Sequence, residues 1–446
     1  MSNDIRIRRG LKLRLKGETE KEMVQAPRSR TYAIKPTDFH AVVPKMVLKE
    51  GAKVQAGDEL FYSKYTGEVS FTSPVSGTLL EIKRAEKRRV MEVVIEADPQ
   101  DTFRQFDVLD PLKEDGEVVK KRIYESGCGA FIIQRPYDIV ADPKDSPKAI
   151  FVSAFNTAPL AADISFILKD RLEAFQAGLN ALSRLAPKVH LSVQAGDTTF
   201  DGIGNVEMHR VWGPHPASNV GVQIHNIDPI NQGERVWTVN PEDVATIGEL
   251  FLTGRYNPVR TVAVAGSEAV DRKYYQTRIG AQISDIIGTV DDKKTRIISG
   301  DVFTGQQLSN GQYLGFYPNE LTLIPEGNKY RMFGWLPFTY NNIPSRSRTS
   351  LSWLFPKKKY VVNTNLNGEE RALVVTGEME EVFPMDIYPM QLLKACMAGD
   401  IEKMENLGIY EVAPEDFALI DYVNTSKLEA QEVIRLGLDL MITEVG

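Results

Sequence analysis

Apolar and polar positions change period along the chain, and these changes divide it into regions. Between residues 42 and 97, short apolar runs are separated by glycines, a pattern typical of strands joined by tight turns. Between residues 149 and 193, two apolar runs flank a stretch in which apolar residues are spaced as on one face of a helix. We therefore expect a β-rich region followed by an α/β region.

The first residues alternate between apolar and cationic side chains, with a break at Arg9-Gly10. Alternation of period two predicts a pair of strands with one outward face. This face is interpreted either as a solvated strand face or as a surface for a charged partner. Its cations are Arg6, Arg8, Lys12, Arg14 and Lys16.

The region from 42 to 97 has a more specific pattern. The spacing EG-x-x-V-x-x-GD-x-L, followed by SP-x-SG-x-L, resembles the biotinyl and lipoyl carrier domains, which are flattened β-sandwiches. A carrier needs a modified lysine at its hairpin tip, whereas the tip here contains Tyr65-Thr66-Gly67-Glu68, with Lys64 before it. We expect a rigid docking module; a swinging-arm carrier modified on Lys64 is the alternative.

Two β-α-β crossovers are predicted in the next region. The first joins an apolar run at 149–152 to one at 189–193. The second joins 236–239 to 261–264 through a helix that has a proline at its first position and ends at Gly254. Two crossovers predict a parallel sheet with flanking helices, a Rossmann-like domain.

The remainder of the chain predicts smaller units. Residues 259–287 follow a strand, turn, strand, helix order that resembles the small ubiquitin-like (SLBB-type) module. Helices are expected at 389–407, 414–422 and 426–442, the last with a capping box of Ser426 and Glu429. The fold class is therefore multidomain α/β. The predicted domains are 1–100, N-terminal strands and a biotinyl/lipoyl-like barrel-sandwich; 101–258, a Rossmann-like domain without a nucleotide fingerprint; 259–330, an SLBB-like domain; and 331–446, an irregular basic and aromatic segment with a C-terminal helical domain.

Composition narrows the functional classes. In 446 residues there are 53 Lys plus Arg against 60 Asp plus Glu, a net charge of −7, which argues against a protein that coats nucleic acid. The two cysteines cannot form a disulfide framework and favour a reducing compartment. No apolar window of about 18 residues is present, so we expect a soluble or peripheral, cytoplasmic protein.

Cofactor and metal motifs are weak. Gly127-Cys128-Gly129 and Gly202-Ile203-Gly204 lack the third glycine of a phosphate-binding loop and are interpreted as tight turns. Cys128 is interpreted as a buried thiol, with a nucleophile as the alternative. None of the five histidines has metal-ligand spacing. We predict no catalytic residue and no metal site in this chain.

Two segments contain candidate residues for binding a quinone. The run 131–137 combines apolar side chains with a cation and an aromatic ring, and His215 lies in the proline- and glycine-rich loop 213–221, before an expected strand at 221–224. A quinone ring needs stacking and a hydrogen-bond donor. The alternative for 131–137 is a core strand leading into a turn, and the alternative for 213–221 is a structural corner. The candidate quinone-binding residues are Phe131, Arg135, Pro136, Tyr137 and His215.

A basic and aromatic cluster follows near residue 350. Aromatic rings beside lysines are typical of a membrane surface, but the segment has no amphipathic helix, so contact with a membrane-embedded partner subunit is favoured. The candidate contact residues are Arg346, Arg348, Trp353, Phe355, Lys357, Lys358 and Lys359.

Longer motifs, in order along the whole chain, resemble one family, the A subunit of the sodium-translocating NADH:quinone reductase of bacterial inner membranes. The matching motifs are EGAKVQAGDELF, SFTSPVSGTLLEIKRAEKRRVMEVVIE, RPYDIVADPKDSPKAIFVSAFNTAPLAAD, FQAGLNALSRL, WGPHPASNVGVQIHNIDPI, VWTVNPEDVATIGELFLTGRY and VFPMDIYPMQLLKACMAGDIEKMENLG. The family is similar in architecture to the C subunit of Rnf-type complexes and to the flavoprotein subunit of complex I. Those relatives hold flavin with a glycine-rich loop and iron–sulfur clusters with cysteines, neither of which this sequence has at the corresponding places.

The resemblance implies a peripheral, cofactor-free subunit on the cytoplasmic face of the bacterial inner membrane, attached through partner subunits, above all the membrane-embedded quinone-site subunit. It implies support for the reduction of ubiquinone or menaquinone coupled to Na⁺ export, with quinone as a ligand of the chain and with flavins and iron–sulfur centres in the partner subunits. The alternative is an independent flavin- or NADH-binding oxidoreductase related to the C subunit of Rnf-type complexes.

Overall fold

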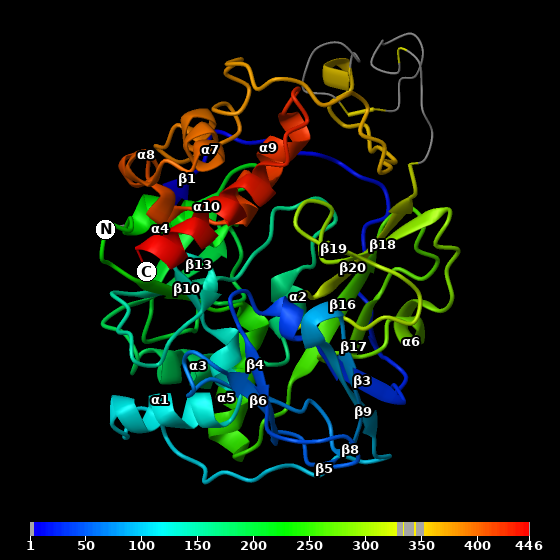
Figure 1. The fold of residues 1–446 in the computed structure, drawn as a ribbon, viewed down its shortest axis with the longest axis vertical. Coiled ribbons are helices and arrows are strands. Elements are labelled where there is room, and N and C mark those ends of the chain that lie inside the picture. The colour runs from blue at the N-terminus through cyan, green and yellow to red at the C-terminus, as the bar shows by residue number, and fades with distance from the viewer. Residues whose placement is uncertain (1–3, 328–332, 334–342, 345–351, 446) are drawn as a thin grey trace.

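The computed structural model describes residues 4–327, 333, 343–344 and 352–445. These residues form four sheets, with helices around them (Figure 1). The N-terminal strands β3 to β9 lie in the lower half of the view, from its centre to its right, and the C-terminal helices α7 to α10, orange to red, lie at the upper left. No helix in the described part of the chain is both long and apolar enough to cross a bilayer.

Residues 31–97 form the predicted β-sandwich. Its two sheets have the orders β3-β9-β8-β5 and β4-β6-β7, and the stacked rings of Phe61 and Phe71, 4.8 Å apart, lie in its core. The glycines of this region supply the turns; Gly51 and Gly57, for example, have positive φ angles. The strands are β3 (Thr31–Ile34), β4 (Pro44–Met46), β5 (Lys53–Val54), β6 (Glu59–Ser63), β7 (Ser70–Thr72), β8 (Gly77–Arg84) and β9 (Val90–Ala97).

The α/β region is built on a seven-stranded sheet with the order β1-β14-β13-β12-β15-β10-β11. The first five strands in this order run parallel, β10 runs antiparallel to them, and β11 runs antiparallel to β10. The strands are β1 (Asp4–Arg6), β10 (Ile133–Arg135), β11 (Ile139–Val140), β12 (Ile150–Ser153), β13 (Val189–Gln194), β14 (Glu207–Trp212) and β15 (Val236–Thr238). The helices are α1 (Gly116–Glu125), α2 (Ile164–Leu168), α3 (Leu172–Leu182), α4 (Val220–Ile227) and α5 (Pro241–Thr253).

The first predicted crossover is confirmed, because β12 and β13 are parallel neighbours joined through α2 and α3. Helices α3 and α5 pack closely at two glycines. A Cβ on Gly178 would lie 1.9 Å from the carbonyl oxygen of Val244, and a Cβ on Gly248 would lie 1.7 Å from that of Ala174. The helical glycines therefore allow the two backbones to approach.

The second predicted crossover is wrong in one respect. Helix α5 exists, but the strand after it, β16, belongs to another sheet, so β15 and β16 are not one β-α-β unit. The strand expected at 221–224 is also wrong: this segment lies within α4. Short apolar runs do not distinguish a strand from a buried helix face, and here the apolar side chains Val222 and Ile224 are buried from a helix that packs beside β12.

The N-terminal strand pair is wrong as well. Only β1 is a strand, and the chain beyond Gly10, whose φ is +132°, makes single bridges from Leu11 to His215 and from Leu15 to Tyr360. The two halves of the segment therefore do not pair with each other. The first half pairs with β14, and the second half pairs with His215 and Tyr360. Its alternation reflects a buried apolar side, with Ile7 and Leu15 inside, and an exposed cationic side.

Residues 259–325 and one N-terminal strand form a six-stranded sheet with the order β19-β18-β20-β16-β17-β2. The predicted strand, turn, strand, helix order at 259–287 is confirmed by β16, β17 and α6. The elements are β2 (Met23–Gln25), β16 (Val259–Ala265), β17 (Tyr274–Arg278), α6 (Ser284–Ile287), β18 (Thr295–Ser299), β19 (Gln306–Leu308) and β20 (Glu320–Pro325).

The C-terminal region is helical, as predicted, but its helices are shorter. The helix expected at 389–407 is divided at Gly399, which has a φ of +64°, and the capping box is wrong because Glu429 is the N-cap residue and Ser426 donates its hydroxyl to the Ala372 carbonyl. The helices are α7 (Pro389–Ala398), α8 (Ile401–Asn406), α9 (Ala418–Val423) and α10 (Ala430–Glu444), with 3-10 turns η6 (Ile409–Glu411) and η7 (Pro414–Phe417).

Candidate functional site

Two corners of the α/β region carry most of the candidate quinone residues. One follows β10, where the Arg135-Pro136 peptide bond is cis, and the other follows β14, where the His215-Pro216 bond is cis. Tyr137, directly after the first corner, has a φ of +84°. The carbonyl of Tyr137 accepts a hydrogen bond from Arg435 in α10. The first corner is thus attached to the C-terminal helices.

Arg135 is almost completely buried, with 1% of its surface exposed. Its Nη1 lies 2.8 Å from Asp416 Oδ2, and its Nη2 pairs with Glu415, both in η7. Burial opposes the charge on Arg135, but the two carboxylates outweigh it and raise its pKa above the usual value. A Cβ on Gly221 would lie 2.4 Å from Nη1, so the start of α4 closes over the pair. The guanidinium of Arg135 therefore links the α/β region to the C-terminal helical region.

His215 lies where three regions meet. Its ring stacks on Phe303, which follows β18, with centroids 5.2 Å apart, and Phe303 in turn meets Tyr422 of α9 edge to face at 6.1 Å. Nδ1 of His215 lies 3.2 Å from the hydroxyl of Thr157, which follows β12. Burial lowers the pKa of His215 to about 4, so the imidazole is neutral at pH 7.

Phe131 lies elsewhere. It is 1% exposed and its ring stacks on Phe316 and Tyr256, inside the core shared by the barrel-sandwich and the α/β region. Pro136 is buried and Tyr137 is half-buried, and Tyr137 packs against the core of the C-terminal helices. The structure thus brings Tyr137 and the ring partner of His215, Phe303, to one cluster and places Phe131 in another.

The first turn of α5 contains two buried acidic residues. Glu242 and Asp243, in the first turn, are 2% and 1% exposed. Arg260 lies 2.7 Å from Asp243 and 3.5 Å from Glu242, and Glu242 also accepts the backbone N–H of Thr261. Burial raises the pKa of Asp243 to about 6. A helix N-terminus would attract a phosphate, but the two acids in the first turn of α5 add negative charge there.

The basic and aromatic segment lies beside the N-terminal cations. Tyr360 donates its N–H to the Arg14 carbonyl and accepts that of Lys16, both at 2.9 Å. Trp353 and Phe355 are 56% and 60% exposed. Arg346 and Arg348 lie outside the described residues. We call the exposed cations of this area the basic ribbon: Arg6, Arg8, Arg9, Lys12, Arg14, Lys16 and Lys357.

Few carboxylates lie close enough to the basic ribbon to form ion pairs with it. Lys359, next to it, lies 2.8 Å from Glu18. Among the described residues, no carboxylate forms an ion pair with the six N-terminal members of the ribbon. The cationic face is therefore available to an anionic surface.

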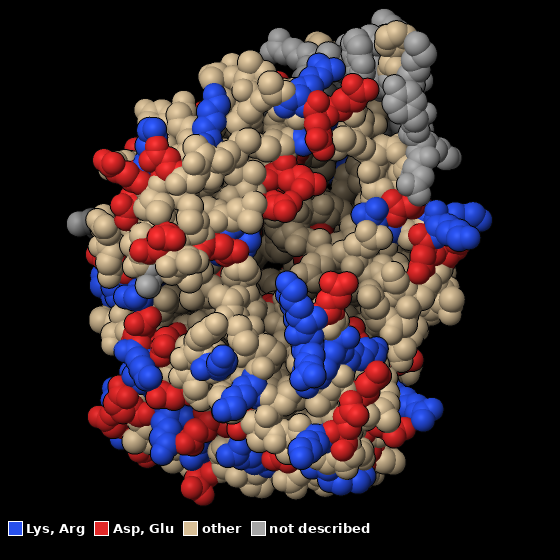
Figure 2. All heavy atoms as spheres, viewed as in Figure 1, with Lys and Arg blue, Asp and Glu red and all other residues tan. Residues whose placement is uncertain are grey.

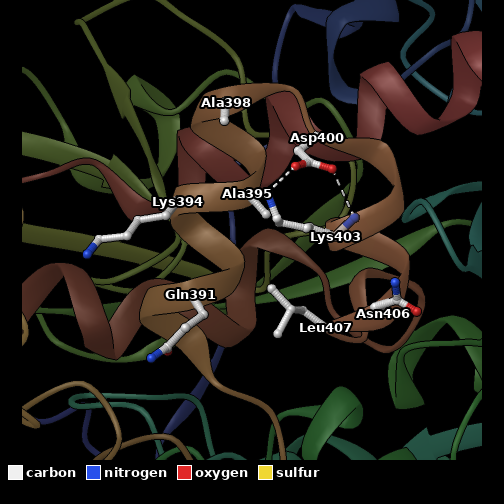
Figure 3. Close-up of a pocket in the computed structure, with 8 residues that line it drawn as sticks. All are labelled: Gln391, Lys394, Ala395, Ala398, Asp400, Lys403, Asn406 and Leu407. Carbon is white, nitrogen blue, oxygen red and sulfur yellow. Dashed lines mark hydrogen bonds and ion pairs between the residues drawn. The ribbon is translucent and has the colours of Figure 1, made fainter.

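A shallow pocket of about 450 Å³ lies between α7 and α8 (Figure 3). It contains none of the candidate quinone residues, and an ion pair between Asp400 and Lys403 lies at its side. A second hollow is visible near the centre of the molecular surface, with acidic side chains on its upper rim and lysines and arginines below it (Figure 2). The pocket between α7 and α8 is lined by Gln391, Lys394, Ala395, Ala398, Asp400, Lys403, Asn406 and Leu407.

Comparison with known proteins identifies the family. Residues 5–98 match the NqrA N-terminal barrel-sandwich hybrid domain, residues 114–256 the NqrA second alpha/beta domain, and residues 261–310 the NQRA C-terminal domain. The A subunit of the Na(+)-translocating NADH-quinone reductase of Neisseria meningitidis serogroup B is 36% identical, over 99% of this chain and all of the relative. The protein of the same name from Cellvibrio japonicus is also 36% identical, over 97% of this chain and 98% of the relative. The chain belongs to the NqrA family.

Among solved structures, an NAD⁺-reducing [NiFe]-hydrogenase in the H₂-reduced state is similar over 75% of this chain and 62% of that chain, with a TM-score of 0.40 and 10% identity. This likeness is too low to support any inference. The family matches, in contrast, confirm the predicted barrel-sandwich, the α/β domain and the SLBB domain of this NqrA chain.

Of the two glycine pairs, Gly127 and Gly202 lie in turns, whereas Gly129 lies in the 3-10 helix η3 (Cys128–Phe131) and Gly204 in an irregular segment. Gly127 has a φ of +88°, and a Cβ on it would lie 2.2 Å from the Thr72 hydroxyl. Cys128 is fully buried, and burial raises the pKa of its thiol to about 12. Gly204 donates its N–H to the side chain of Gln176. The backbone N–H of Gly204 is therefore used within the chain.

One cluster is not among the predicted sites. His190 and His209 lie on adjacent strands with Glu207 beside them, and none of the three is a candidate from the sequence. No local signal points to this cluster, because the two histidines are 19 positions apart and the strand β14 is not predicted.

Proposed function

We propose that this NqrA-family chain is the peripheral, cofactor-free subunit of a Na⁺-translocating NADH-quinone reductase, located on the cytoplasmic face of a bacterial inner membrane. The proposal rests on the match to relatives of that name over 99% of this chain and their whole length. In this role the chain supports the reduction of ubiquinone or menaquinone coupled to Na⁺ export, while the flavins and iron–sulfur centres lie in partner subunits.

The acids at α5 support the absence of a nucleotide cofactor. In Rossmann-like sheets, ligands bind at the carboxyl ends of the strands where the strand order reverses. Here β12 lies between β13 and β15, so that position is the gap between β12 and β15, and α5 begins directly after β15. We assign the domain to the Rossmann-like class and propose that Glu242 and Asp243 repel phosphates from it.

The basic ribbon supports attachment to the membrane-embedded subunit. The ribbon pairs with the basic and aromatic segment at Tyr360, and this segment also carries the exposed rings of Trp353 and Phe355. Cations together with exposed rings fit a partner with acidic loops near the lipid headgroups. We therefore propose that this face, with Lys357, Lys358 and Lys359, contacts the membrane-embedded quinone-site subunit.

Quinone contact is proposed for the corner residues Tyr137 and His215. The neutral imidazole of His215 offers a hydrogen-bond donor, and Phe303 offers a stacking surface. His215 is 6% exposed, and Arg135, Pro136 and Phe131 are buried as well, so a quinone would reach any of the four only after a rearrangement.

Two experiments test the proposed role in the complex. The chain purified with its complex and then separated should show no flavin absorbance, and a stoichiometric flavin spectrum would overturn the cofactor-free part. Affinity purification of the tagged chain should recover the membrane subunits, and changing Arg8, Lys12 and Arg14 together to glutamate should abolish that recovery. Recovery that is unchanged in the triple variant would refute the docking face.

Two further experiments address ligands. A photoreactive quinone analogue added to the complex should label segments 127–140 or 212–218, and labelling of neither would overturn the quinone contact. Calorimetry with NADH should detect no binding to the separated chain. Binding of NADH at one equivalent would favour the independent oxidoreductase instead.

A further inference from the structure

Strands β13 and β14 place two imidazoles and a carboxylate together. They are parallel neighbours in which His190 is opposite Glu207, and Ser192 is opposite His209. Side chains two positions apart lie on the same face of a strand, so all four belong to one face of the sheet. His190 and His209 are 2% and 5% exposed, whereas the Glu207 side chain is 45% exposed and opens the cluster to solvent.

The spacing of the three donor groups matches a metal site. His190 Nδ1 lies 3.0 Å from His209 Nε2 and 3.5 Å from Glu207 Oε2, and the three ligand atoms lie within 4.8 Å of one another. Two nitrogens that each lie about 2.0–2.1 Å from a tetrahedral metal ion are about 3.3 Å apart. An ion can therefore enter between these atoms with small side-chain rotations.

One ring of the cluster is held in place by its neighbour, and two polar atoms of this face have no partner. Phe151 stacks on His190 at 4.6 Å and fixes the plane of its ring. The buried hydroxyl of Ser192 has no hydrogen-bond partner among the described residues, and neither has His190 Nε2. Unsatisfied polar atoms of this kind are uncommon in a protein core, and they leave this face of the sheet with unused hydrogen-bonding capacity.

We propose that His190, His209 and Glu207 form a binding site for a late first-row divalent cation, with Zn²⁺ as the preferred ion. Two imidazoles and one carboxylate suit Zn²⁺, and a water molecule would complete four ligands. The site lies at the amino ends of β13 and β14, away from the carboxyl ends where ligands of such sheets bind. Its role is structural: the ion links two neighbouring strands.

The test uses the full-length chain without a histidine tag, stripped of metal with a chelator. Calorimetry with Zn²⁺ should show one tight equivalent, and Co²⁺ should give the visible absorption of a tetrahedral site. Glu207→Gln changes an exposed group and should weaken binding about 10-fold or more, and His209→Gln about 100-fold or more. His40→Gln is the matched control. His40 also lies beside a carboxylate, 2.6 Å from Asp439, but it belongs to no group of three potential metal ligands among the described residues.

The outcomes separate a site from a hydrogen bond between neutral rings. Loss of the tight equivalent in both site variants, with His40→Gln unchanged and circular dichroism preserved in all, supports the site. Absence of stoichiometric binding to the unaltered chain would overturn the proposal and leave only an N–H···N hydrogen bond. Equal affinity in Glu207→Gln and the unaltered chain, or a loss in His40→Gln alone, would also overturn it, because the ion would then bind elsewhere.

Discussion

The contact between Arg135 and Asp416 gives the sharpest test of how the C-terminal helices are held. Asp416 is 2% exposed, and its Oδ2 accepts hydrogen bonds from Arg135 Nη1 at 2.8 Å and from the Ala413 N–H at 2.9 Å. The change Asp416→Asn keeps the shape and one acceptor but removes the charge. It therefore leaves a buried guanidinium without its most buried partner.

The expected cost follows from burial. Removing one partner of a buried ion pair costs about 3–5 kcal/mol. Glu415 still pairs with Arg135 after the change, and its side chain is 40% exposed, so we expect a value near the lower end, about 3 kcal/mol. The control is Asp201→Asn, which breaks the surface pair with Arg210, 2.7 Å long and 48% and 37% exposed, at a cost of about 0–1 kcal/mol.

Native-state hydrogen exchange is the suitable assay, because a chain of several domains has no single unfolding free energy. Amides of α9 and α10 that exchange by detachment of these helices should lose protection by about 100-fold in Asp416→Asn, which corresponds to about 3 kcal/mol. The double change Arg135→Met with Asp416→Asn should restore most of that protection, because no buried guanidinium then lacks its charged partner and the asparagine still accepts the Ala413 N–H. A loss in Asp416→Asn no larger than in Asp201→Asn would refute the reasoning.

Three other predictions concern packing, pH and thiols. Gly248→Ala places a Cβ 1.7 Å from the α3 backbone and should lower the hydrogen-exchange protection of the α3 and α5 amides by the equivalent of about 3 kcal/mol, while Gly202→Ala, with open space around it, should change that protection by no more than about 0.5 kcal/mol. Burial raises the pKa of Glu320 from 4.5 to about 8, so the folded chain holds a proton there that the unfolded chain has released, and stability is lost as pH rises from about 5 to 8. Glu320→Gln should therefore melt higher than the unaltered chain at pH 8 and lose that advantage near pH 5; an equal difference at both pH values would contradict it. The buried thiol of Cys128 should resist a disulfide reagent at pH 8 until the chain is denatured, with Cys396 reacting first; fast reaction of both thiols in the native chain would count against it.

The elements that the sequence predicts correctly are those whose signals are local. Helix α5 has proline at its first position and Gly254, with a φ of +70°, after its end, and both follow from the chain itself. The strand prediction at 221–224 fails because four residues cannot distinguish a strand from a buried helix face. The sheet that contains β16 cannot be inferred either, since partners in a sheet are chosen by tertiary packing.

The candidate site is predicted less completely, because its decisive contacts are distant in sequence. The charge of Arg135 makes it a candidate, but its partners in η7 are about 280 positions away, and the sequence offers 60 acids among which to choose. His190 and His209 lack the helical spacing of metal ligands, yet parallel strands bring them within 3.0 Å. Composition identifies which chemistry is available, whereas topology decides which groups meet.

The position of Phe303 connects the proposed quinone corner with the domain contacts. It belongs to the SLBB part, stacks on His215 of the α/β part and meets Tyr422 of the C-terminal helices, so one ring touches all three. Its carbonyl also accepts a hydrogen bond from the side chain of Gln431 in α10, at 3.0 Å. A quinone that stacked on Phe303 beside His215 would compete with a contact between domains, and its binding free energy would include the cost of separating them. The proposed binding of quinone at this corner would therefore be coupled to the same domain arrangement that Arg135 and Asp416 stabilise.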